Sequence, residues 1–294
     1  MTDVQPVIAV VGPGAVGGLL AWLLHRAGAN VVVVGRTGSV ERINTQGLRV
    51  TSGVFGAGTE AVSARETVPP GASVMLTVKT FGLDDSLDLI AQSQPREVLS
   101  LMNGVGHTEV LSQRLEGIPV ASGSISVEAS RAADGTIEHK SSFTRIAVPS
   151  AAENFVAVRA LADTAVELTV AGTDAEVLWQ KFRFLAPMAL LTSYWQAPMK
   201  EALTRDPDLT RALLAEVVAC EAANGIPDSV EALTAILEGL PSTMRSSLQN
   251  DLAAGRPSEL DSIGGELIRQ AERHGIEVPA LKQIMAELSP NRRQ

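Results

Sequence analysis

Short, wholly apolar runs alternate with longer amphipathic stretches in the first half of the chain. Residues 7–11 (VIAVV) and 31–34 (VVVV) have no polar position, which is typical of strands buried on both faces of a parallel sheet. Between them, residues 15–27 have a helical composition and are followed by Gly28, a common residue at helix ends. This order predicts a strand–helix–strand unit at the N-terminus.

The same alternation continues along the first half. Repetition of strand and helix favours an α/β fold with a doubly wound sheet that is covered by helices on both faces. Two later segments, IEHK and TRIAV, follow a glycine turn and predict added antiparallel strands. The further strands of the main sheet are expected over residues 74–78, 97–102 and 119–125, with helices around 83–92 and 108–115 between them.

After Gly172 the pattern changes, because no convincing strand remains and apolar positions recur with the helical period. We therefore expect two domains, an α/β domain over residues 1–171 and an all-helical domain over residues 172–294. The predicted helices of the second domain cover residues 174–195, 207–224, 228–238, 243–253, 260–274 and 279–288.

Composition narrows the function classes. The chain has 294 residues and a formal net charge of −9, and it lacks the basic stripe that would fit nucleic acid. Its single cysteine, Cys220, excludes an intramolecular disulfide and a multi-cysteine metal centre, and its histidines have no ligand spacing, so no metal is expected. Because no uncharged apolar run reaches roughly 18 residues, and because the N-terminus lacks a signal-peptide pattern, we expect a cytoplasmic protein without membrane contact.

A glycine-rich turn follows the first strand and opens the first helix. Its residues are Gly12, Pro13, Gly14, Ala15, Val16 and Gly17. In such a turn the first glycine permits the tight bend, the second lets the backbone approach a pyrophosphate, and the third lets the helix pack on the strand. The helix N-terminus then offers amides to the phosphates. Although the motif alone could be a turn without a ligand, its position between two predicted strands favours nucleotide binding.

The end of the second strand indicates which nucleotide is bound. NAD enzymes usually carry a carboxylate there, which bonds the ribose hydroxyls, whereas this chain has Arg36 and no acid before Glu41. A guanidinium suits a 2′-phosphate that a carboxylate would repel. The sequence therefore predicts NADP(H), although Arg36 could also be an ordinary surface arginine.

Polar side chains also follow two later strands. Lys79 comes directly after residues 74–78, and Asn103 after residues 97–102. Ligands of an open parallel sheet lie beyond the carboxyl ends of its strands, so both side chains are candidates for the site. A solvated lysine and a simple Asn-Gly turn are the alternatives.

The second domain offers one candidate proton donor and two candidate binding residues. Lys181 stands on an otherwise apolar helical surface, where desolvation would lower its pKa and suit it to protonate an alkoxide. The alternative is a lysine whose charged end extends from a packed helix to water. Ser247 and Glu259 are twelve positions apart. The alternative for the segment around Glu259 is a purely structural role, in which Ser258 is a helix N-cap and Asp261 completes a capping box.

Taken in order, these features resemble the ketopantoate reductase family, also called 2-dehydropantoate 2-reductases. The resemblance extends over nearly the whole chain and is specific because the motifs occur in the right order with about the right spacing. They are GPGAVG at 12–17, Arg36, Lys79, the MNG turn with Asn103, LWQK with Lys181, and SSLQNDLAAGRPSELDSIGG near the end.

The resemblance implies a Rossmann N-terminal domain, a helical C-terminal domain, and NADPH-dependent reduction of ketopantoate to pantoate in pantothenate biosynthesis. It implies that Lys181 is the general acid and that Glu259 acts with it in catalysis. Asn103, Lys181, Ser247 and Glu259 are expected to bind the substrate, a small 2-oxo acid, while Lys79 and Asn103 also line the cofactor. A homodimer is the assembly that we consider.

The chain departs from the family pattern on the helix of Lys181. The family usually has an asparagine one turn after the lysine and often another a turn beyond, whereas this chain has Leu185 and Ala189, which share a helix face with Lys181. Three functions therefore stay open. They are ketopantoate reduction, a related NADP-dependent dehydrogenase for another 2-oxo acid, 2-hydroxy acid or imine, and a non-catalytic NADP-sensing protein.

Overall fold

The computed structural model describes residues 5–289, which form two compact units. The first unit consists of the described residues up to Met102 together with His107–Val177. The second consists of Asn103–Gly106 and the chain from Leu178 onward. The short loop Asn103–Gly106 therefore belongs, by its contacts, to the second unit, although the residues on either side of it belong to the first.

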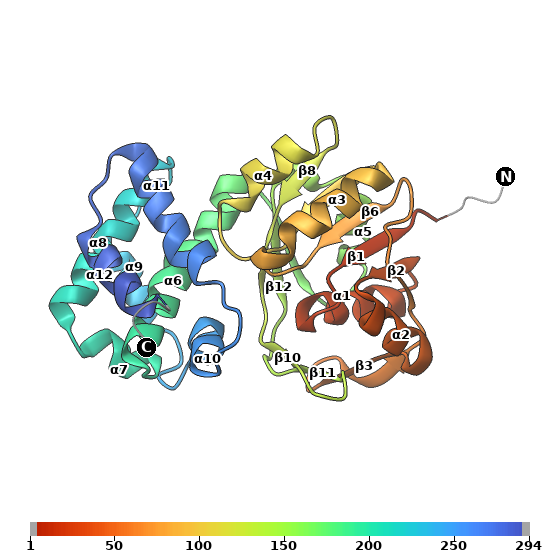
Figure 1. Ribbon diagram of the computed structural model, residues 1–294, viewed down its shortest axis with the longest axis horizontal. Helices are drawn as coiled ribbons and strands as arrows, with labels where there is room; N and C mark the ends of the chain where they lie inside the picture. The colour runs from red at the N-terminus through yellow and green to blue at the C-terminus, as the bar shows by residue number, and fades with distance from the viewer. Residues whose placement is uncertain (1–4, 290–294) are drawn as a thin grey trace. The chain divides into compact units, whose positions relative to one another are not determined.

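The first unit is built on a six-stranded sheet in the order β5-β2-β1-β6-β7-β8, in which every neighbouring pair is parallel (Figure 1). The predicted strand–helix–strand start is confirmed, because β1 and β2 pair in register from Ile8 opposite Val31. The six strands are β1 (Ile8–Val11), β2 (Val31–Val34), β5 (Ser63–Arg65), β6 (Ser73–Leu76), β7 (Glu97–Ser100) and β8 (Val120–Ser122).

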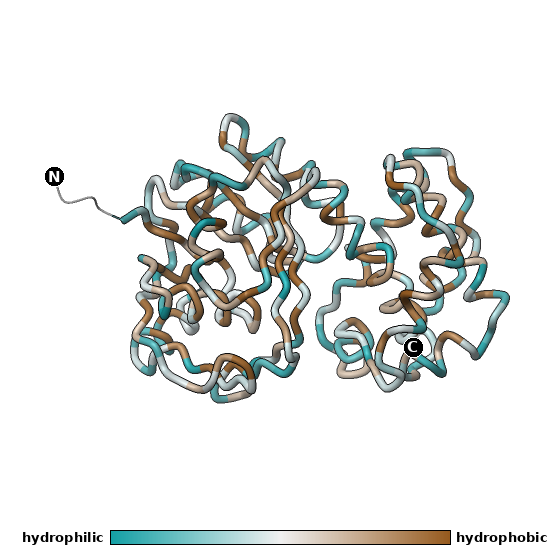
Figure 2. The backbone as a smooth tube through the Cα atoms, turned by 180° about the vertical axis from the view of Figure 1, so that it is seen from behind, coloured by the Kyte–Doolittle hydropathy of each residue, from teal (hydrophilic) through white to brown (hydrophobic). Residues whose placement is uncertain are grey.

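Both faces of this sheet are covered by helices, which confirms the doubly wound architecture. Side chains of a strand alternate between faces, so Ile8 and Val10 pack into one apolar cluster while Ala9 and Val11 pack into another. Figure 2 shows apolar stretches of the backbone, in brown, running through the interior of this unit. The first cluster includes α1 (Ala15–Arg26) and α5 (Val156–Ala162), and the second includes α3 (Leu83–Ser93) and α4 (His107–Arg114).

The predicted single strand over residues 119–125 is wrong. The chain leaves the main sheet after β8 and enters another sheet at β9 (Ser124–Ser126), with Gly123 between them. A Cβ atom at Gly123 would lie 2.8 Å from the Ala147 carbonyl oxygen and 3.0 Å from a Leu101 methyl carbon. The close approach of these neighbours explains why the change of sheet occurs at a glycine.

Two smaller sheets complete the first unit. One has the order β10-β11-β3-β4 and the other β13-β12-β9. The predicted added strands are β11 and β12, and each has one antiparallel neighbour and one parallel neighbour rather than antiparallel neighbours only. The strands are β3 (Leu48–Ser52), β4 (Gly56–Glu60), β10 (Ala129–Arg131), β11 (Ile137–His139), β12 (Arg145–Val148) and β13 (Glu167–Val170); α2 (Thr37–Gln46), η1 (Thr80–Gly82) and η2 (Ser150–Ala152) complete the unit.

In the second unit, all regular secondary structure of the described residues from Leu178 onward is helical. Several helices begin where a polar side chain caps the first turn, as at Asp206, which accepts from the Leu209 amide and precedes Pro207. The predicted helix over 260–274 begins as a π-helix. The elements are α6 (Asp174–Trp195), α7 (Met199–Thr204), α8 (Pro207–Ala223), α9 (Val230–Glu238), α10 (Ser247–Ala253), η3 (Asp261–Gly265), α11 (Glu266–His274) and α12 (Pro279–Leu288).

A buried carboxylate joins two of these helices. Glu216 of α8 accepts hydrogen bonds from the amides of Ala280 and Leu281, each at 2.8 Å. These amides belong to the first turn of α12, where backbone N–H groups have no partner within their own helix.

Within residues 5–289, no helix combines the length and the apolar composition that crossing a membrane requires.

Candidate active site

The glycine turn after β1 is tightly packed. Gly12 has a φ angle of +97°, and a Cβ there would lie 2.7 Å from a Val78 methyl carbon. A Cβ at Gly17 would collide with the Gly12 carbonyl oxygen and with the Thr77 hydroxyl. The Thr77 hydroxyl donates to that same carbonyl at 3.0 Å. The first and third glycines of the motif are therefore required by the backbone conformation and by the packing of the turn.

The second glycine has different surroundings, as a ligand site requires. A Cβ at Gly14 would meet no atom within 4 Å. Gly14 is also the N-cap of α1, and no side chain caps this helix. A helix N-terminus without a side-chain cap presents backbone N–H groups and the positive end of the helix dipole. The turn therefore fits a pyrophosphate, which would lie against Gly14, Ala15 and Val16.

Arg36 lies just past the end of β2, at the N-cap position of α2. Its side chain is 86% exposed, and its Nη2 atom is 3.9 Å from Oδ2 of Asp85 in the first turn of α3. A Cβ at Gly35 would lie 2.6 Å from the ring of Pro13. The exits of β1 and β2 are thus in contact, and Arg36 extends from the same edge as the glycine turn.

Two more cations belong to this edge of the first unit. Lys79 is exposed and lies at the N-cap position of η1, three residues after β6 ends. Arg131 of β10 donates a hydrogen bond from Nη1 to the carbonyl oxygen of Pro13 at 3.0 Å. Sequence reasoning missed Arg131, because 118 positions separate it from Pro13 and no local pattern connects them.

In the second unit, three predicted site residues form one hydrogen-bonded chain. The Lys181 ammonium donates to Oδ1 of Asn103 at 2.8 Å, and Nδ2 of Asn103 donates to Oε2 of Glu259 at 3.2 Å. Lys181 is on α6, Asn103 follows β7, and Glu259 precedes η3. The structure thus brings together groups that are 78 and 156 positions apart in the sequence.

The electrostatics of this chain suit a proton donor. Burial lowers the pKa of the Lys181 ammonium to about 8, and the negative charge of Glu259 opposes that shift. Glu259 is itself buried, with 9% of its surface exposed. A lysine with a lowered pKa stays largely protonated near neutral pH, yet it releases its proton more readily than an exposed lysine.

The loop that carries Asn103 lies against η3 and the start of α11 through two glycines. Gly104 has a φ angle of +95°, and a Cβ there would lie 3.0 Å from the Ser262 carbonyl oxygen. A Cβ at Gly106 would lie 2.5 Å from the carboxyl group of Glu266. Larger residues at either position would displace the loop, so these two glycines position the Asn103 side chain.

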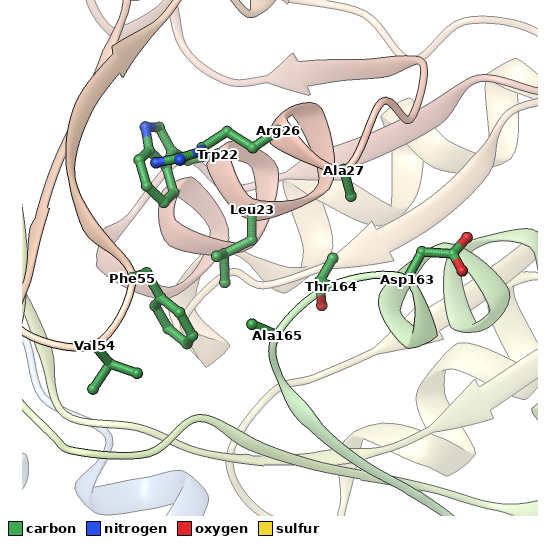
Figure 3. A pocket seen from close by; sticks show the side chains of 9 residues that line it. All are labelled: Trp22, Leu23, Arg26, Ala27, Val54, Phe55, Asp163, Thr164 and Ala165. Atoms are coloured by element: carbon green, nitrogen blue, oxygen red, sulfur yellow. The ribbon is translucent and has the colours of Figure 1, made fainter.

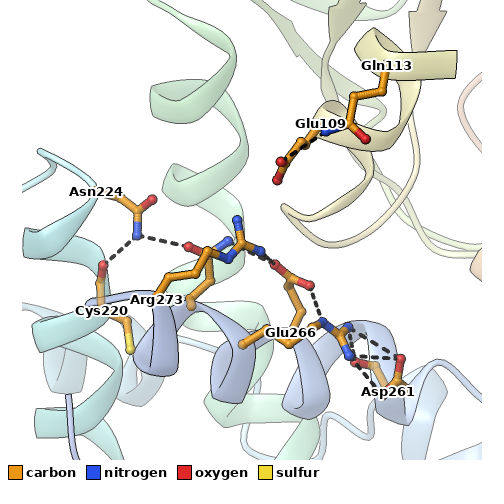
Figure 4. Close-up of polar contacts among 9 residues, drawn as sticks. Glu109, Gln113, Cys220, Asn224, Asp261, Glu266 and Arg273 are labelled. Carbon is orange, nitrogen blue, oxygen red and sulfur yellow. Dashed lines mark hydrogen bonds and ion pairs between the residues drawn. The ribbon is translucent and has the colours of Figure 1, made fainter. Parts of the chain in front are cut away.

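The Glu266 carboxylate anchors the helix that follows η3. It is 4% exposed and accepts hydrogen bonds from Arg269 and Gln270 at 2.8 Å and from Arg273 at 3.1 Å (Figure 4). The same figure shows Asp261 bonded to an arginine, which is Arg269. The alternative in which Asp261 completes a capping box with Ser258 is therefore not observed. The Asp261 carboxylate is instead paired with Arg269, eight positions further along the chain.

Ser247, a predicted substrate-binding residue, is exposed in the first turn of α10. Its neighbour Ser246 is the N-cap, accepts from the Gln249 amide at 3.0 Å, and bonds to the Thr192 hydroxyl of α6 at 2.8 Å. In the part of the chain that the structure describes, no hydrogen bond joins Ser247 to the Asn103–Lys181–Glu259 chain. The role of Ser247 stays a prediction.

The helix face beyond Lys181 is apolar. Leu185 is half-buried against the core of the second unit, and Ala189 is buried. Thr192, one turn further, bonds back to the Met188 carbonyl oxygen at 2.7 Å. The residues that follow Lys181 at helical spacing thus present carbon rather than hydrogen-bonding groups.

A pocket of about 370 Å³ lies elsewhere on the first unit (Figure 3). Trp22, Leu23 and Arg26 of α1 line it together with Val54 and Phe55. None of the predicted site residues borders this pocket, so it does not belong to the candidate active site. Among residues 5–289, no cluster of histidine, cysteine or acidic side chains has the arrangement of a metal site.

The fold and the family models that match the chain define an NADPH-dependent oxidoreductase. The chain belongs to the ketopantoate reductase family. The model described as "Ketopantoate reductase PanE/ApbA" matches residues 8–153, and the corresponding C-terminal model matches residues 175–291. Reductases of this family use NADPH.

Individual relatives are similar over almost their whole length. The 2-dehydropantoate 2-reductase of Caulobacter vibrioides is 28% identical over 291 residues, which cover 96% of this chain and 98% of that protein. A PanE/ApbA family ketopantoate reductase from Ralstonia eutropha has a TM-score of 0.85 at 28% identity, covering 96% of this chain and 97% of that one. D-mandelate dehydrogenase has a TM-score of 0.83 with the same coverage, but at 19% identity the likeness concerns the fold alone.

Proposed function

We propose that this protein reduces a 2-oxo acid with NADPH, and that its substrate is 2-dehydropantoate, which becomes pantoate in pantothenate biosynthesis. The observation that carries the proposal is the partly buried hydrogen-bonded chain of Lys181, Asn103 and Glu259, in which the lysine is held by a 2.8 Å hydrogen bond. Membership of the ketopantoate reductase family supports the same substrate.

The first unit would hold the cofactor. The turn from Gly12 to Gly17 would bind the pyrophosphate through the amides at the start of α1, and Arg36 would bind the 2′-phosphate. Lys79 and Asn103 would line the nicotinamide part. When bound, NADPH supplies the hydride that the carbonyl carbon accepts.

Lys181 would act on the carbonyl oxygen. Its ammonium would donate a hydrogen bond to that oxygen, stabilise the negative charge that develops there, and then transfer a proton from Nζ to the alkoxide. Asn103 holds Nζ in one position, because its Oδ1 atom accepts a hydrogen bond from one of the N–H groups of the lysine. Glu259 keeps the lysine protonated, because its negative charge opposes the effect of burial on the lysine pKa.

Substrate selection would involve the other predicted residues. Glu259 would accept a hydrogen bond from the substrate hydroxyl, and Ser247 would donate to the substrate carboxylate. The apolar surface at Leu185 and Ala189 supports a second candidate function, the reduction of another 2-oxo acid with a less polar side chain, because neither residue can bond a hydroxyl.

Oxidation of NADPH measured against a panel of 2-oxo acids, with 2-dehydropantoate included, tests the proposal. We expect one NADPH to be consumed for each pantoate formed, and the highest kcat/KM for 2-dehydropantoate. Turnover of another 2-oxo acid at a higher kcat/KM would support the second candidate. Tight binding of NADPH without turnover of any member of the panel would contradict both and would indicate an NADP-sensing protein.

A further inference from the structure

Arg131 reaches the glycine turn from a different sheet. It is the last residue of β10, and its Nη1 atom donates to the Pro13 carbonyl oxygen at 3.0 Å. Helix α1, which begins after the turn, packs against β10 and β11. The guanidinium of Arg131 is therefore hydrogen-bonded to the backbone between the first two glycines of the motif.

This guanidinium lacks a carboxylate partner in the described part of the chain. No aspartate or glutamate oxygen of residues 5–289 lies within 4.0 Å of it, although its side chain is exposed. Most other arginines on the first unit are paired, as Arg49 is with Asp134 at 3.7 Å and Arg145 is with Glu167 at 2.9 Å.

A second arginine, Arg42, lies near Arg131. Burial and then the charges of Arg131 and Arg49 lower the pKa of Arg42 on α2, and Asp134 opposes that effect. Mutual repulsion of this kind requires the guanidinium groups to be near one another. Arg131 itself lies at the turn before α1 and adds a positive charge there, in a protein whose formal net charge is −9.

We propose that Arg131 is a binding residue for the pyrophosphate of the nucleotide and that its hydrogen bond to Pro13 holds it at the turn for this purpose. A guanidinium has five N–H donors, and the bond to Pro13 uses one of them. Guanidinium groups bind phosphate oxygens through short, charge-assisted hydrogen bonds. This inference rests on the proposed nucleotide site, and it assigns to that site a cation outside the glycine motif.

Loss of Arg131 and loss of Arg36 should affect the binding of the two nucleotides differently. The pyrophosphate is present in both NADPH and NADH, whereas the 2′-phosphate is present only in NADPH. Loss of the Arg131 charge should therefore weaken both nucleotides by the same factor, and loss of Arg36 should weaken NADPH alone.

The test is a titration of each nucleotide, followed by its fluorescence, with four variants. Arg131→Gln keeps an N–H donor for Pro13 but removes the charge, and Arg131→Lys keeps the charge. Arg145→Gln is the matched control, because Arg145 is an exposed strand arginine paired with Glu167. Arg36→Ala reports on the proposed nucleotide site itself. Circular dichroism and thermal unfolding show that each variant is folded.

For Arg131→Gln we expect the dissociation constants of NADPH and NADH to rise together by about tenfold, the low end for a hydrogen bond to a charged group. The effect should shrink at high ionic strength, because salt screens exposed charges. Arg131→Lys should retain most of the affinity, and Arg145→Gln should bind like the unmodified protein.

The inference is overturned if Arg131→Gln binds both nucleotides as the unmodified protein does, or if Arg131→Lys loses as much affinity as Arg131→Gln. Either result, together with a selective loss of NADPH in Arg36→Ala, would leave the proposed function standing without this residue. If the unmodified protein bound neither nucleotide, the proposed function would fail as well.

Discussion

The ammonium of Lys181 and the side-chain oxygen of Asn103 are joined by a 2.8 Å hydrogen bond, although the residues are 78 positions apart. The bond fixes the orientation of the Asn103 amide, because its oxygen must face the lysine while its nitrogen donates to Glu259. The amide therefore separates a cation from an anion, so that Glu259 acts on Lys181 through its charge. This arrangement determines at which pH the protein should work.

We expect kcat/KM to fall as pH rises through about 8, the pKa to which burial lowers Lys181. Above that pH the lysine is neutral and can no longer protonate the alkoxide. Glu259→Gln should move this fall to lower pH, because it removes the negative charge that keeps the lysine protonated. The measurement is the pH profile of kcat/KM in both proteins, and an identical alkaline limb would contradict the role of Glu259.

Arg36→Ala should weaken NADPH binding by about 10- to 150-fold, the effect of losing a hydrogen bond between charged groups of roughly 1.5–3 kcal/mol. NADH, which lacks the 2′-phosphate, should bind almost unchanged. Isothermal titration of the two nucleotides measures both effects. Asp84→Asn is a suitable control, because Asp84 lies beside Asp85 but pairs with Arg114. Equal affinity of the unmodified protein for NADH and NADPH would show that Arg36 does not select the cofactor.

A third prediction concerns the apolar residue one turn after Lys181. Because Leu185 cannot bond a hydroxyl, the protein should reduce less polar branched 2-oxo acids with a kcat/KM within about tenfold of that for 2-dehydropantoate. Leu185→Asn should shift the preference towards 2-dehydropantoate, which carries a hydroxyl. Leu203→Asn on α7 provides a control, since Leu203 is also a partly buried residue packed on the same core.

Steady-state kinetics with both substrates in the three proteins gives the answer. Strong selectivity for 2-dehydropantoate in the unmodified protein would mean that another residue, such as Ser247 or Glu259, already recognises the hydroxyl. The interpretation of Leu185 would then be wrong.

The stability of the helical unit should depend on a different buried carboxyl group. Glu221 is 0% exposed, and Arg183 Nη1 lies 3.7 Å from its Oε1 and 2.6 Å from Asp228. Burial raises the pKa of Glu221 to about 7, Asp228 adds to the rise, and Arg183 opposes it. The folded protein therefore holds a proton that the unfolded chain releases between pH 4.5 and about 7.

Since the unfolded state binds fewer protons over that interval, the free energy of unfolding should fall as pH rises through it and should level off above about pH 7. Glu221→Gln should reduce this dependence, because an amide does not titrate. Urea unfolding at several pH values measures the slope in each protein. The same slope in Glu221→Gln and in the unmodified protein would assign the dependence to other groups.

Helices with a regular apolar period were predictable from the sequence, and α6 has the predicted bounds, Asp174–Trp195. The buried strands β1 and β2 were predictable because an unbroken valine-rich run fits few other structures. By contrast, β4 (GAGTE) and α2 carry almost no apolar pattern, and Ile43 is the one buried residue of α2. Such elements form because tertiary neighbours pair with them, which local sequence does not reveal.

The same distinction applies to the site. Lys181, Asn103 and Glu259 could be singled out from their motifs, but their hydrogen bonds depend on how distant segments fold together. The sequence predicts ordinary helix over residues 260–274, whereas η3 is π-helical, and side-chain pattern does not distinguish the two because they differ in backbone hydrogen bonding. Arg131 could not be found from a strand of three residues, ASR, whose contact with Pro13 spans 118 positions.

Replacement of Lys181 tests the central claim most directly. Kinetics of Lys181→Ala and of Gln180→Ala, a control at an exposed position of the same helix, should be compared with NADPH affinity in each protein. The account predicts that Lys181→Ala lowers kcat by at least about 100-fold, the lower range for a positioned general acid, while NADPH binds nearly as before. Near-normal kcat in Lys181→Ala would contradict the account and would direct attention to Lys79.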